Sequence, residues 1–355
     1  MKNGEFGMEN RDLKFEIYGC RLSNLDYPET IFSFWGCKSR KISASAQTFA
    51  ALFIHIVCTA VGRIVEKSYI CSEKNISIMI LFPNAKINLG LQVTSRRPDG
   101  YHNLDTVFLP IPLRDSLEVV ARPDGDSATD CVLHLLGNTL EGNPDDNLVT
   151  KAYRLLKQEH DLPPVEVWLY KHIPSGAGLG GGSADAAFML TMLNGMFALG
   201  IDDDRLEAYA TMLGADCPIF IRNKPVYATG IGNIFSPIDL SLSGYHIVVV
   251  KPPVFVSTRE AFRYVKPAEP AITLDKKILR PTQEWRHIIT NDFEFSVFPQ
   301  YPQLGFIKDT LYEQGAVYAS MSGSGSALYG LFHPDALPHD LHALFPDCFC
   351  WTAPL

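Results

Sequence analysis

The sequence predicts an α+β protein of about two domains. Its 355 residues are 46% hydrophobic and 20% charged, a composition that is typical of globular proteins and excludes collagen-like, coiled-coil and wholly disordered chains. A chain of this length corresponds to roughly two domains of average size. From Met79 to the C-terminus, segments that alternate like strands are interspersed with segments that have the periodicity of helices.

Composition and charge also narrow the classes of function. The net charge of −8 gives no basic surface for a nucleic acid, whereas a phosphate on a small molecule can be held by backbone amides and a few cations. No run of 18 apolar residues is present, so we expect no membrane span and a cytoplasmic protein. Eight cysteines without a CxxC pair argue against a zinc site or a disulfide-stapled fold.

Residues 1–78 differ from the rest of the chain. They contain four of the eight cysteines, and no stretch alternates regularly enough to predict a strand. A transit peptide would be poor in acidic residues, and this segment is not. We therefore expect an N-terminal extension that is not part of the native product, with translation starting at Met79; a small additional domain is the alternative.

The elements after Met79 can be assigned in order. Residues 85–93 alternate apolar and polar side chains, which predicts a half-buried strand, and residues 98–100 predict a turn. Further strands are predicted at 104–112, 117–121, 131–136 and 165–173, and helices at 147–160 and 184–197. Asp203 is expected to cap a short helix that ends at Gly214, before a short strand at 217–221. A second set comprises a strand at 247–250, helices at 258–265 and 304–314, and two strands around a glycine-serine turn within 316–332.

The most informative segment is a glycine-rich loop. Five of the seven residues from 176 to 182 are glycine, and a predicted strand precedes them while a predicted helix follows. Glycines let backbone N–H groups approach a ligand closely, and the amides and dipole of a helix N-terminus favour an anion. The loop is therefore predicted to bind phosphate; the strand and the helix that fix its ends argue against a flexible linker.

Two known kinds of phosphate loop fit this segment less well. Gly176, Gly178 and Gly181 satisfy the GxGxxG pattern of dinucleotide sites, with Asp202 about 20 residues further on. Such a site needs that acidic residue at the end of a second strand, whereas 184–199 has the pattern of one apolar helix. A Walker A loop is excluded because the chain contains no Gly-Lys pair. A nicotinamide-dependent dehydrogenase stays as an alternative with weaker support.

Three segments resemble the motifs of a known kinase family. In chain order they are FPNAKINLGL at 82–91, PSGAGLGGGSADAA at 174–187 and MSGSGSALYG at 321–330, and they resemble the first, second and third motifs of the GHMP kinases. The resemblance implies a two-lobed GHMP kinase fold, with an S5-domain-2-like N-terminal lobe and a ferredoxin-like C-terminal lobe. We assign residues 79–240 to the first lobe and 241–355 to the second.

Other segments resemble one branch of this family. RPDGYHNL at 97–104, GADCPIFI at 214–221 and NDFE at 291–294 are similar to the branch that phosphorylates the 2-hydroxyl of 4-diphosphocytidyl-2-C-methyl-D-erythritol in non-mevalonate isoprenoid biosynthesis. This resemblance implies ATP and Mg²⁺ as cofactors, a cytidine diphosphate-linked sugar alcohol as substrate, and a monomer or weak homodimer. The alternatives are a GHMP kinase for another small alcohol, such as mevalonate or homoserine, and a non-catalytic protein of this fold.

The resemblance also implies roles for individual residues. Asp216 corresponds to the catalytic base of the family and Lys86 to its catalytic lysine. The ATP-binding segment would comprise Pro174, Ser175, Gly176, Ala177, Gly178, Leu179, Gly180, Gly181, Gly182, Ser183 and Ala184, supported by the turn of Gly323, Ser324 and Gly325. The substrate would contact Asn88, Tyr101, His102, Lys171, Thr258 and Phe262, with Tyr101 stacking on the cytosine and His102 hydrogen-bonding its edge. Ser183 is the candidate metal ligand, and N-cap of the following helix is its alternative role.

Overall fold

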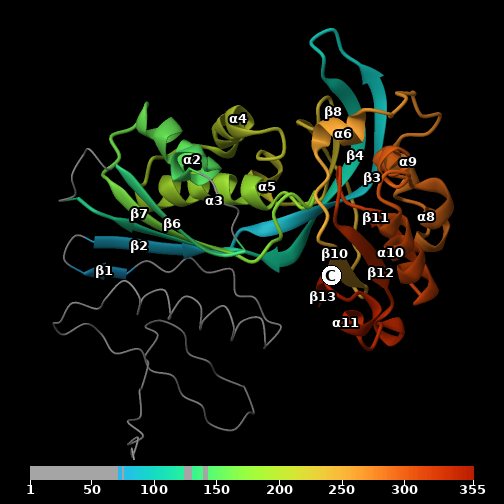
Figure 1. Cartoon of the computed structure of the whole chain (residues 1–355). Helices are drawn as coiled ribbons and strands as arrows, with labels where there is room; N and C mark the ends of the chain where they lie inside the picture. Colours follow the sequence, from blue (N-terminus) through green and yellow to red (C-terminus); the bar gives the residue numbers. More distant parts are fainter. Residues whose placement is uncertain (1–70, 74–75, 124–129, 139–142) are drawn as a thin grey trace, which may run out of the picture. The chain divides into compact units, whose positions relative to one another are not determined.

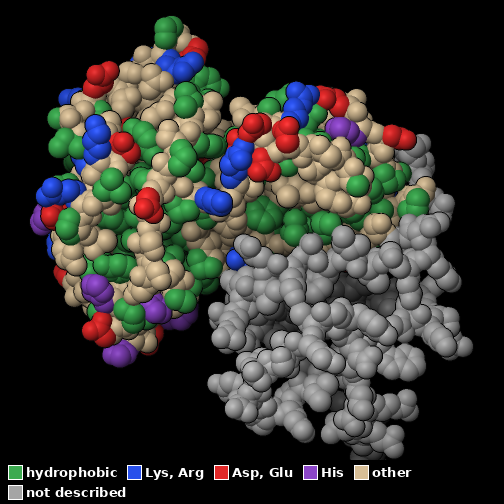
Figure 2. All heavy atoms as spheres, turned by 180° about the vertical axis from the view of Figure 1, so that it is seen from behind, with side chains coloured by type: hydrophobic (Ala, Val, Ile, Leu, Met, Phe, Trp, Pro, Cys, Tyr) green, Lys and Arg blue, Asp and Glu red, His purple; other side chains and the backbone are tan. Residues whose placement is uncertain are grey.

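The computed structural model describes residues 71–73, 76–123, 130–138 and 143–355. The chain divides into two compact units, Met1–Val57 and Cys58–Leu355, and every described residue belongs to the second. The expectations for residues 1–70 therefore lie outside the described part. In that part, no helix is long and apolar enough to cross a membrane. Basic and acidic side chains of the described residues lie intermixed on the face shown in Figure 2.

A five-stranded sheet carries the helices of the N-terminal half. The strands follow the order β1-β2-β5-β7-β6, and only β6 and β7 are parallel. They are β1 (Cys71–Glu73), β2 (Ile76–Leu81), β5 (Ser116–Ala121), β6 (Cys131–Gly137) and β7 (Val165–Lys171). The helices α2 (Leu148–Lys157), α3 (Gly181–Met196) and α4 (Asp203–Leu213) lie together over one face of this sheet (Figure 1). Tyr153, Leu156 and Met189 belong to the apolar core that these helices share with the sheet.

The strands β1 and β2 begin in the segment where we expected none. Ile78 pairs with Val120 and Met79 with Val119, so the predicted boundary at 78/79 falls inside β2. The expectation that residues 71–78 contain no strand was wrong. Ile76–Leu81 is apolar at nearly every position, so it lacks the alternation of apolar and polar residues on which the prediction relied. The proposed division into an extension and lobes at 79–240 and 241–355 stays a prediction.

A long hairpin connects this layer to the C-terminal half. It consists of β3 (Asn84–Arg96) and β4 (His102–Arg114), and β8 (Val226–Thr229) and β9 (Ile234–Pro237) complete an antiparallel sheet of order β3-β4-β8-β9. The predicted turn at 98–100 joins the two long strands. β3 is buried at every position from Asn84 to Leu91, so the prediction of a half-buried strand was wrong. Its polar residues Lys86 and Asn88 are covered because that side of the strand faces the glycine loop.

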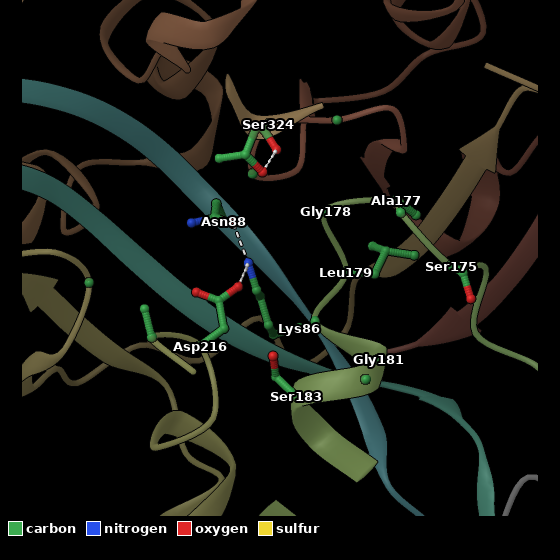
Figure 3. A pocket seen from close by; sticks show the side chains of 18 of the residues that line it. Lys86, Asn88, Ser175, Ala177, Gly178, Leu179, Gly181, Ser183, Asp216 and Ser324 are labelled. Carbon is green, nitrogen blue, oxygen red and sulfur yellow. Dashed lines mark hydrogen bonds and ion pairs between the residues drawn. The ribbon is translucent and has the colours of Figure 1, made fainter. Parts of the chain in front are cut away.

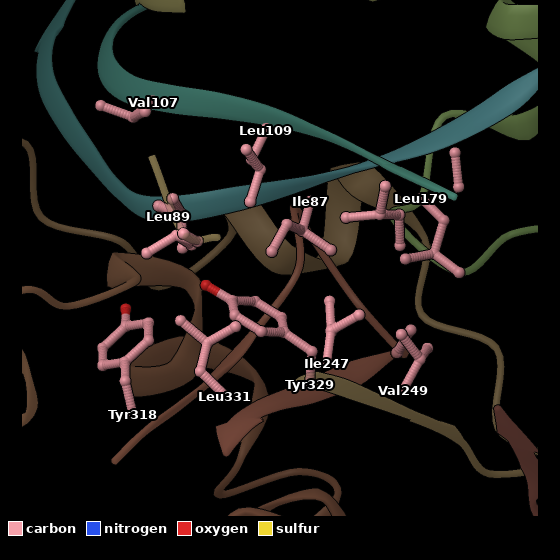
Figure 4. Packing of buried hydrophobic residues seen from close by; sticks show 14 of the residues in the cluster. Ile87, Leu89, Val107, Leu109, Leu179, Ile247, Val249, Tyr318, Tyr329 and Leu331 are labelled. Atoms are coloured by element: carbon pink, nitrogen blue, oxygen red, sulfur yellow. The ribbon is translucent and has the colours of Figure 1, made fainter. Parts of the chain in front are cut away.

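The C-terminal half is a four-stranded antiparallel sheet with helices. Its order is β11-β12-β10-β13, and the strands are β10 (His246–Lys251), β11 (Tyr318–Met321), β12 (Leu328–Phe332) and β13 (Phe349–Pro354). The helices are α6 (Thr258–Phe262), α7 (Leu274–Lys277), α8 (Thr282–Ile288), α9 (Asp292–Val297), α10 (Pro302–Glu313) and α11 (Leu341–Leu344). One face of the sheet packs on the hairpin, where Tyr329 and Leu331 meet Ile87 and Leu89 (Figure 4). Residues of the sheet's other side share a core with α9 and α10.

Most predicted elements are confirmed, with two local corrections. Residues 217–221 do not form a strand; they run into the short helix α5 (Ile219–Arg222), because Pro218 takes the φ of −61° that starts a helix. The N-cap of α4 is Asp202 rather than Asp203, since the Asp202 side chain accepts the Arg205 N–H. The prediction omitted the short elements β8, β9, β13, α7, α8, α9 and α11, whose few residues carry little periodicity.

Candidate active site

The glycine loop between β7 and α3 forms an anion cradle. Gly176, Gly178 and Gly180 have φ values of +61°, +74° and +72°, a region that side chains rarely allow. A Cβ on Gly178 would overlap the carbonyl oxygen of Ser322, and a Cβ on Gly180 would lie 2.9 Å from the ring of Phe220. α3 begins at Gly181 without a side-chain cap, so no side chain pairs with its first amides. Its first residues, Gly181 to Ser183, line a cavity. Both steric and backbone demands therefore select glycine here.

The elements that follow the loop exclude a dinucleotide-binding site. It leads directly into the single helix α3, and Asp202 caps the next helix instead of ending a second strand. Ser183 is not the N-cap of α3, because the helix already starts at Gly181. The Ser183 hydroxyl instead points toward Lys86 and Asp216 (Figure 3).

The predicted third-motif turn supports the loop by direct contacts. Ser322 Oγ donates a hydrogen bond to the Gly178 carbonyl over 2.8 Å, and the Ala327 N–H donates to the Ala177 carbonyl over 3.1 Å. A Cβ on Gly323 would lie 3.3 Å from the Gly178 backbone, so the two glycines allow the turn and the loop to approach closely. The turn of Gly323, Ser324 and Gly325 therefore lies against the glycine loop, and the residues that flank it make the hydrogen bonds.

The NDFE segment at 291–294 holds that turn in place. The Asn291 amide donates to the carbonyls of Met321 and Gly323, each over 2.8 Å. Glu294, nearly buried, accepts the Met321 N–H over 2.8 Å and the Ser320 hydroxyl over 3.0 Å. The resemblance to the kinase family singles out this segment, but no local sequence pattern predicts that its polar side chains contact a turn about 30 residues away.

Lys86 and Asp216 meet in front of the loop. The Lys86 ammonium lies 3.3 Å from Asp216 Oδ2 and donates to Asn88 Oδ1 over 2.8 Å (Figure 3). The lysine is buried, whereas the side chain of Asp216 is 41% exposed. The Lys86 N–H donates to the Leu179 carbonyl over 2.9 Å, which ties β3 to the glycine loop. The buried ammonium of Lys86 is thus paired with the carboxylate of Asp216, which a ligand can reach.

One cavity of about 1160 Å³ brings the predicted site residues together. Its lining includes Lys86, Asn88, Tyr101, His102, Lys171, Asp216, Thr258, Phe262, Ser324 and the whole run from Pro174 to Ser183. Ala184 does not line it, because its side chain is fully buried with Phe108 and Phe220. Thr258 Oγ1 lies 3.4 Å from Ser324 Oγ, so α6 begins beside the third-motif turn.

Three packed aromatic rings line another part of the cavity. His102 stacks on Phe262 with ring centroids 4.6 Å apart and planes at 18°, and Phe262 meets Phe293 edge to face. Burial, together with the charge of Arg96, lowers the pKa of His102, so the imidazole is neutral at pH 7. Tyr101 is 62% exposed beside this pair. Flat apolar faces and a neutral ring nitrogen suit a heteroaromatic base.

Lys171 lies between the carboxyl groups of two aspartates. Its ammonium contacts Asp115 Oδ2 and Asp185 Oδ2. Asp115 also accepts the N–H groups of His172 and Ile173 over 2.6 and 2.8 Å, which fixes the backbone just before the loop. Burial raises the pKa of Asp185 to about 8 against the attraction of Lys171, and Asp185 Oδ1 has no hydrogen-bond partner. No local pattern in the sequence indicates Asp115, and the substrate contact of Lys171 stays a prediction.

The described cysteines give the site no nucleophile. Cys217, next to Asp216, is buried, and burial raises the pKa of its thiol to about 11, so it is no nucleophile at neutral pH. Cys131, Cys348 and Cys350 are half-buried.

Known proteins share both sequence and fold with this chain. Residues 147–224 and 277–347 match the family models described as "GHMP kinases N terminal domain" and "GHMP kinases C terminal". The 4-diphosphocytidyl-2-C-methyl-D-erythritol kinase of Bacteroides fragilis is 62% identical over 277 residues, which cover 78% of this chain and 100% of that protein. The enzyme of the same name from Parabacteroides distasonis is 54% identical over the same shares of both chains.

Solved structures agree with these relatives. A crystal structure of 4-(cytidine 5'-diphospho)-2C-methyl-D-erythritol kinase is 33% identical, with a TM-score of 0.66, over 77% of this chain and 98% of that one. The Methanococcus jannaschii mevalonate kinase is 14% identical, with a TM-score of 0.58, over 80% of this chain and 99% of that one. The second likeness shows a shared fold alone.

Proposed function

Because the chain belongs to the GHMP kinases, a family of ATP-dependent small-molecule kinases, and to their 4-diphosphocytidyl-2-C-methyl-D-erythritol kinase branch, we propose that it phosphorylates the 2-hydroxyl of that compound. One observation carries the proposal for this chain's own residues. The open carboxylate of Asp216, paired with buried Lys86, faces the glycine loop within one cavity. From the same branch of the family we also expect a cytoplasmic protein that is a monomer or weak homodimer.

The loop and α3 position the phosphoryl donor. Loop amides and the uncapped N-terminus of α3 offer donors and a positive dipole end to the triphosphate oxygens. The loop itself contains no lysine, so the cation on the acceptor side comes from Lys86, whose strand contacts the loop. Its ammonium donates to Asn88 and pairs with Asp216, which leaves a third N–H for an oxygen of the ligand.

Asp216 accepts the proton of the attacking hydroxyl. General bases act across hydrogen-bond distance, and the exposed side of this carboxylate faces the cavity. Lys86, 3.3 Å from Oδ2, offsets negative charge as the hydroxyl attacks. Phosphoryl transfer needs mainly positioning and charge stabilisation, and these two residues supply both on the acceptor side.

The aromatic part of the cavity recognises the cytosine. The base stacks against Tyr101, while Phe262, stacked on the imidazole, holds His102 at the edge of the base. Because its pKa is lowered, the neutral imidazole of His102 has one donor and one acceptor nitrogen for the edge of the base. The tether between the two ends then places the sugar alcohol beside Asp216.

The donor set fits Mg²⁺ that is held mainly by the triphosphate. No group of three His, Cys, Asp or Glu side chains in the described ranges could hold a metal. Mg²⁺ on nucleotides needs only one or two protein oxygens. The Ser183 hydroxyl lies in the first turn of α3, and the unpartnered Oδ1 of Asp185 belongs to the residue two positions further along the helix. Ser183 would be the ligand, and the ion would offset charge on the phosphate oxygens.

A coupled assay tests the proposal on the purified full-length chain. ADP release is measured with ATP, Mg²⁺ and either 4-diphosphocytidyl-2-C-methyl-D-erythritol, mevalonate or homoserine as acceptor. Release with the first acceptor alone, and a phosphate on its 2-hydroxyl by ³¹P NMR, is expected. Turnover with mevalonate or homoserine but not with the cytidine compound would overturn the proposal.

A further inference from the structure

The side-chain amide of Asn88 is fixed in one orientation. Its Oδ1 accepts a hydrogen bond from the Lys86 ammonium over 2.8 Å, and its Nδ2 donates to Thr106 Oγ1 over 2.9 Å. Asn88 is 1% exposed and Thr106 is fully buried, so water does not replace either contact. The two ends of an amide differ as acceptor and donor, and a flipped Asn88 would turn an NH₂ group toward the ammonium.

A bulge in β3 determines which end of the Asn88 amide faces Lys86 and which faces Thr106. The pairing of β3 with β4 shifts register between Asn88 and Leu91, and Thr106 lies opposite Leu91. Thr106 Oγ1 donates its single proton to the Gly90 carbonyl over 2.7 Å. Its oxygen is therefore an acceptor toward Asn88, which must present Nδ2 there and Oδ1 to Lys86.

The bulge itself depends on glycine. Gly90 has a φ of +75°, and a Cβ at this position would lie 2.7 Å from Ile289 and 2.8 Å from Leu274. Bulges of this kind often re-aim side chains beside active sites. From the C-terminal sheet, the Tyr329 hydroxyl donates to the Asn88 carbonyl over 2.7 Å and holds the backbone of the same residue.

We propose that Thr106 is a positioning residue of the phosphoryl-transfer site. Its hydroxyl donates to the Gly90 carbonyl and accepts the Nδ2 proton of Asn88, so it fixes the orientation of the Asn88 amide. Asn88 in turn holds the Lys86 ammonium beside Asp216. Thr106 does not line the cavity, so it acts through Asn88 and not by touching a ligand. The inference rests on the proposed function, because it gives this hydroxyl a part in that reaction.

Matched substitutions separate the hydroxyl from the shape of the side chain. Thr106→Val keeps the shape and removes the hydroxyl, whereas Thr106→Ser keeps the hydroxyl. We expect Thr106→Val to lower kcat about tenfold or more with KM for ATP changed less than about twofold, and Thr106→Ser to retain the kcat of the wild type. Thr310→Val is the control, since Thr310 is a buried threonine whose hydroxyl donates to the Phe306 carbonyl far along the chain in α10.

A double-mutant cycle tests whether Thr106 acts through Asn88. Thr106→Val is expected to change kcat less than about twofold when it is introduced into Asn88→Ala, because the amide that it orients is already gone. Full additivity of the two substitutions would overturn the inference. So would equal kcat values for wild type and Thr106→Val in an enzyme that is active.

A measurement without turnover keeps the two proposals distinguishable. The Asn88 Nδ2 protons are observed by ¹⁵N NMR and identified by their loss in Asn88→Asp. Their exchange with solvent is expected to be slow in the wild type and in Thr106→Ser, and about tenfold or more faster in Thr106→Val. Equal exchange rates in all three proteins would refute the orienting role of Thr106, whichever acceptor the chain phosphorylates. Inactivity of the wild type, by itself, would count only against the proposed function.

Discussion

Gly178→Ala is the substitution that tests the packing of the phosphate loop most directly. Gly178 has a φ of +74°, and a Cβ there would overlap the Ser322 carbonyl oxygen of the third-motif turn. The left-handed conformation costs about 1–2 kcal/mol with a side chain present. Separation of loop and turn would also break the hydrogen bonds from Ser322 to Gly178 and from Ala327 to Ala177, at about 1 kcal/mol each. We therefore expect a loss of about 3–4 kcal/mol in the free energy of unfolding.

Gly182→Ala is the matched control within the same run of glycines. Nothing lies within 4 Å of a Cβ at Gly182, and this residue is already in α3, where alanine is the better helix former. It should leave the free energy of unfolding unchanged or raise it by up to about 1 kcal/mol. Urea unfolding of the full-length chain, followed by fluorescence, measures both variants. The steric account fails if Gly178→Ala is as stable as Gly182→Ala.

Three further predictions concern the chemistry of the cavity. Asp216→Asn should lower kcat by about 10²- to 10⁴-fold, because the variant lacks the general base. The thermal midpoint should change little, because Lys86 keeps Asn88 as its hydrogen-bond acceptor. Turnover at the wild-type rate would exclude Asp216 as the base. Tyr101→Ala should raise KM for the cytidine substrate by roughly 5- to 150-fold while Tyr101→Phe does not, and an unchanged KM would exclude stacking. Burial raises the pKa of Asp185 to about 8, so the folded chain holds a proton that the unfolded chain releases, and stability should decline as the pH rises through about 4 to 8. Asp185→Asn should flatten this decline in thermal midpoint, and an equally steep decline in the variant would contradict the assignment.

The parts of the site that lie on contiguous motifs could be predicted from the sequence. A run of glycines between a strand and a helix specifies its own backbone, so the loop from Gly176 to Gly181 can be predicted without any tertiary contact. Alternation likewise placed Lys86 and Asn88 on one side of a strand. It did not reveal that both are buried, because the loop that covers them lies about 90 residues further along the chain.

The supporting contacts could not be predicted, because each joins segments that are distant in sequence. Asp115 reaches Lys171 and Ile173 across 56 and 58 residues, and Asn291 reaches Gly323 across 32. Neither residue stands in a pattern that differs from an ordinary loop or cap. The error at 217–221 is of the same kind: an apolar run of five residues fits a strand or a helical turn, and Pro218 decides between them only in its tertiary setting.

These long-range contacts give the loop one anchor from each sheet. Next to the first sheet, Asp115 accepts the Ile173 N–H before the loop. From the hairpin, Lys86 donates its N–H to Leu179, and from the turn beyond β11, Ser322 donates to Gly178. The hairpin strand that contacts the loop also carries Lys86 and Asn88, so the acceptor side of the reaction is built on the same support as the donor side. Since transfer depends on the alignment of the two sides, the relative placement of the three sheets is itself part of the site.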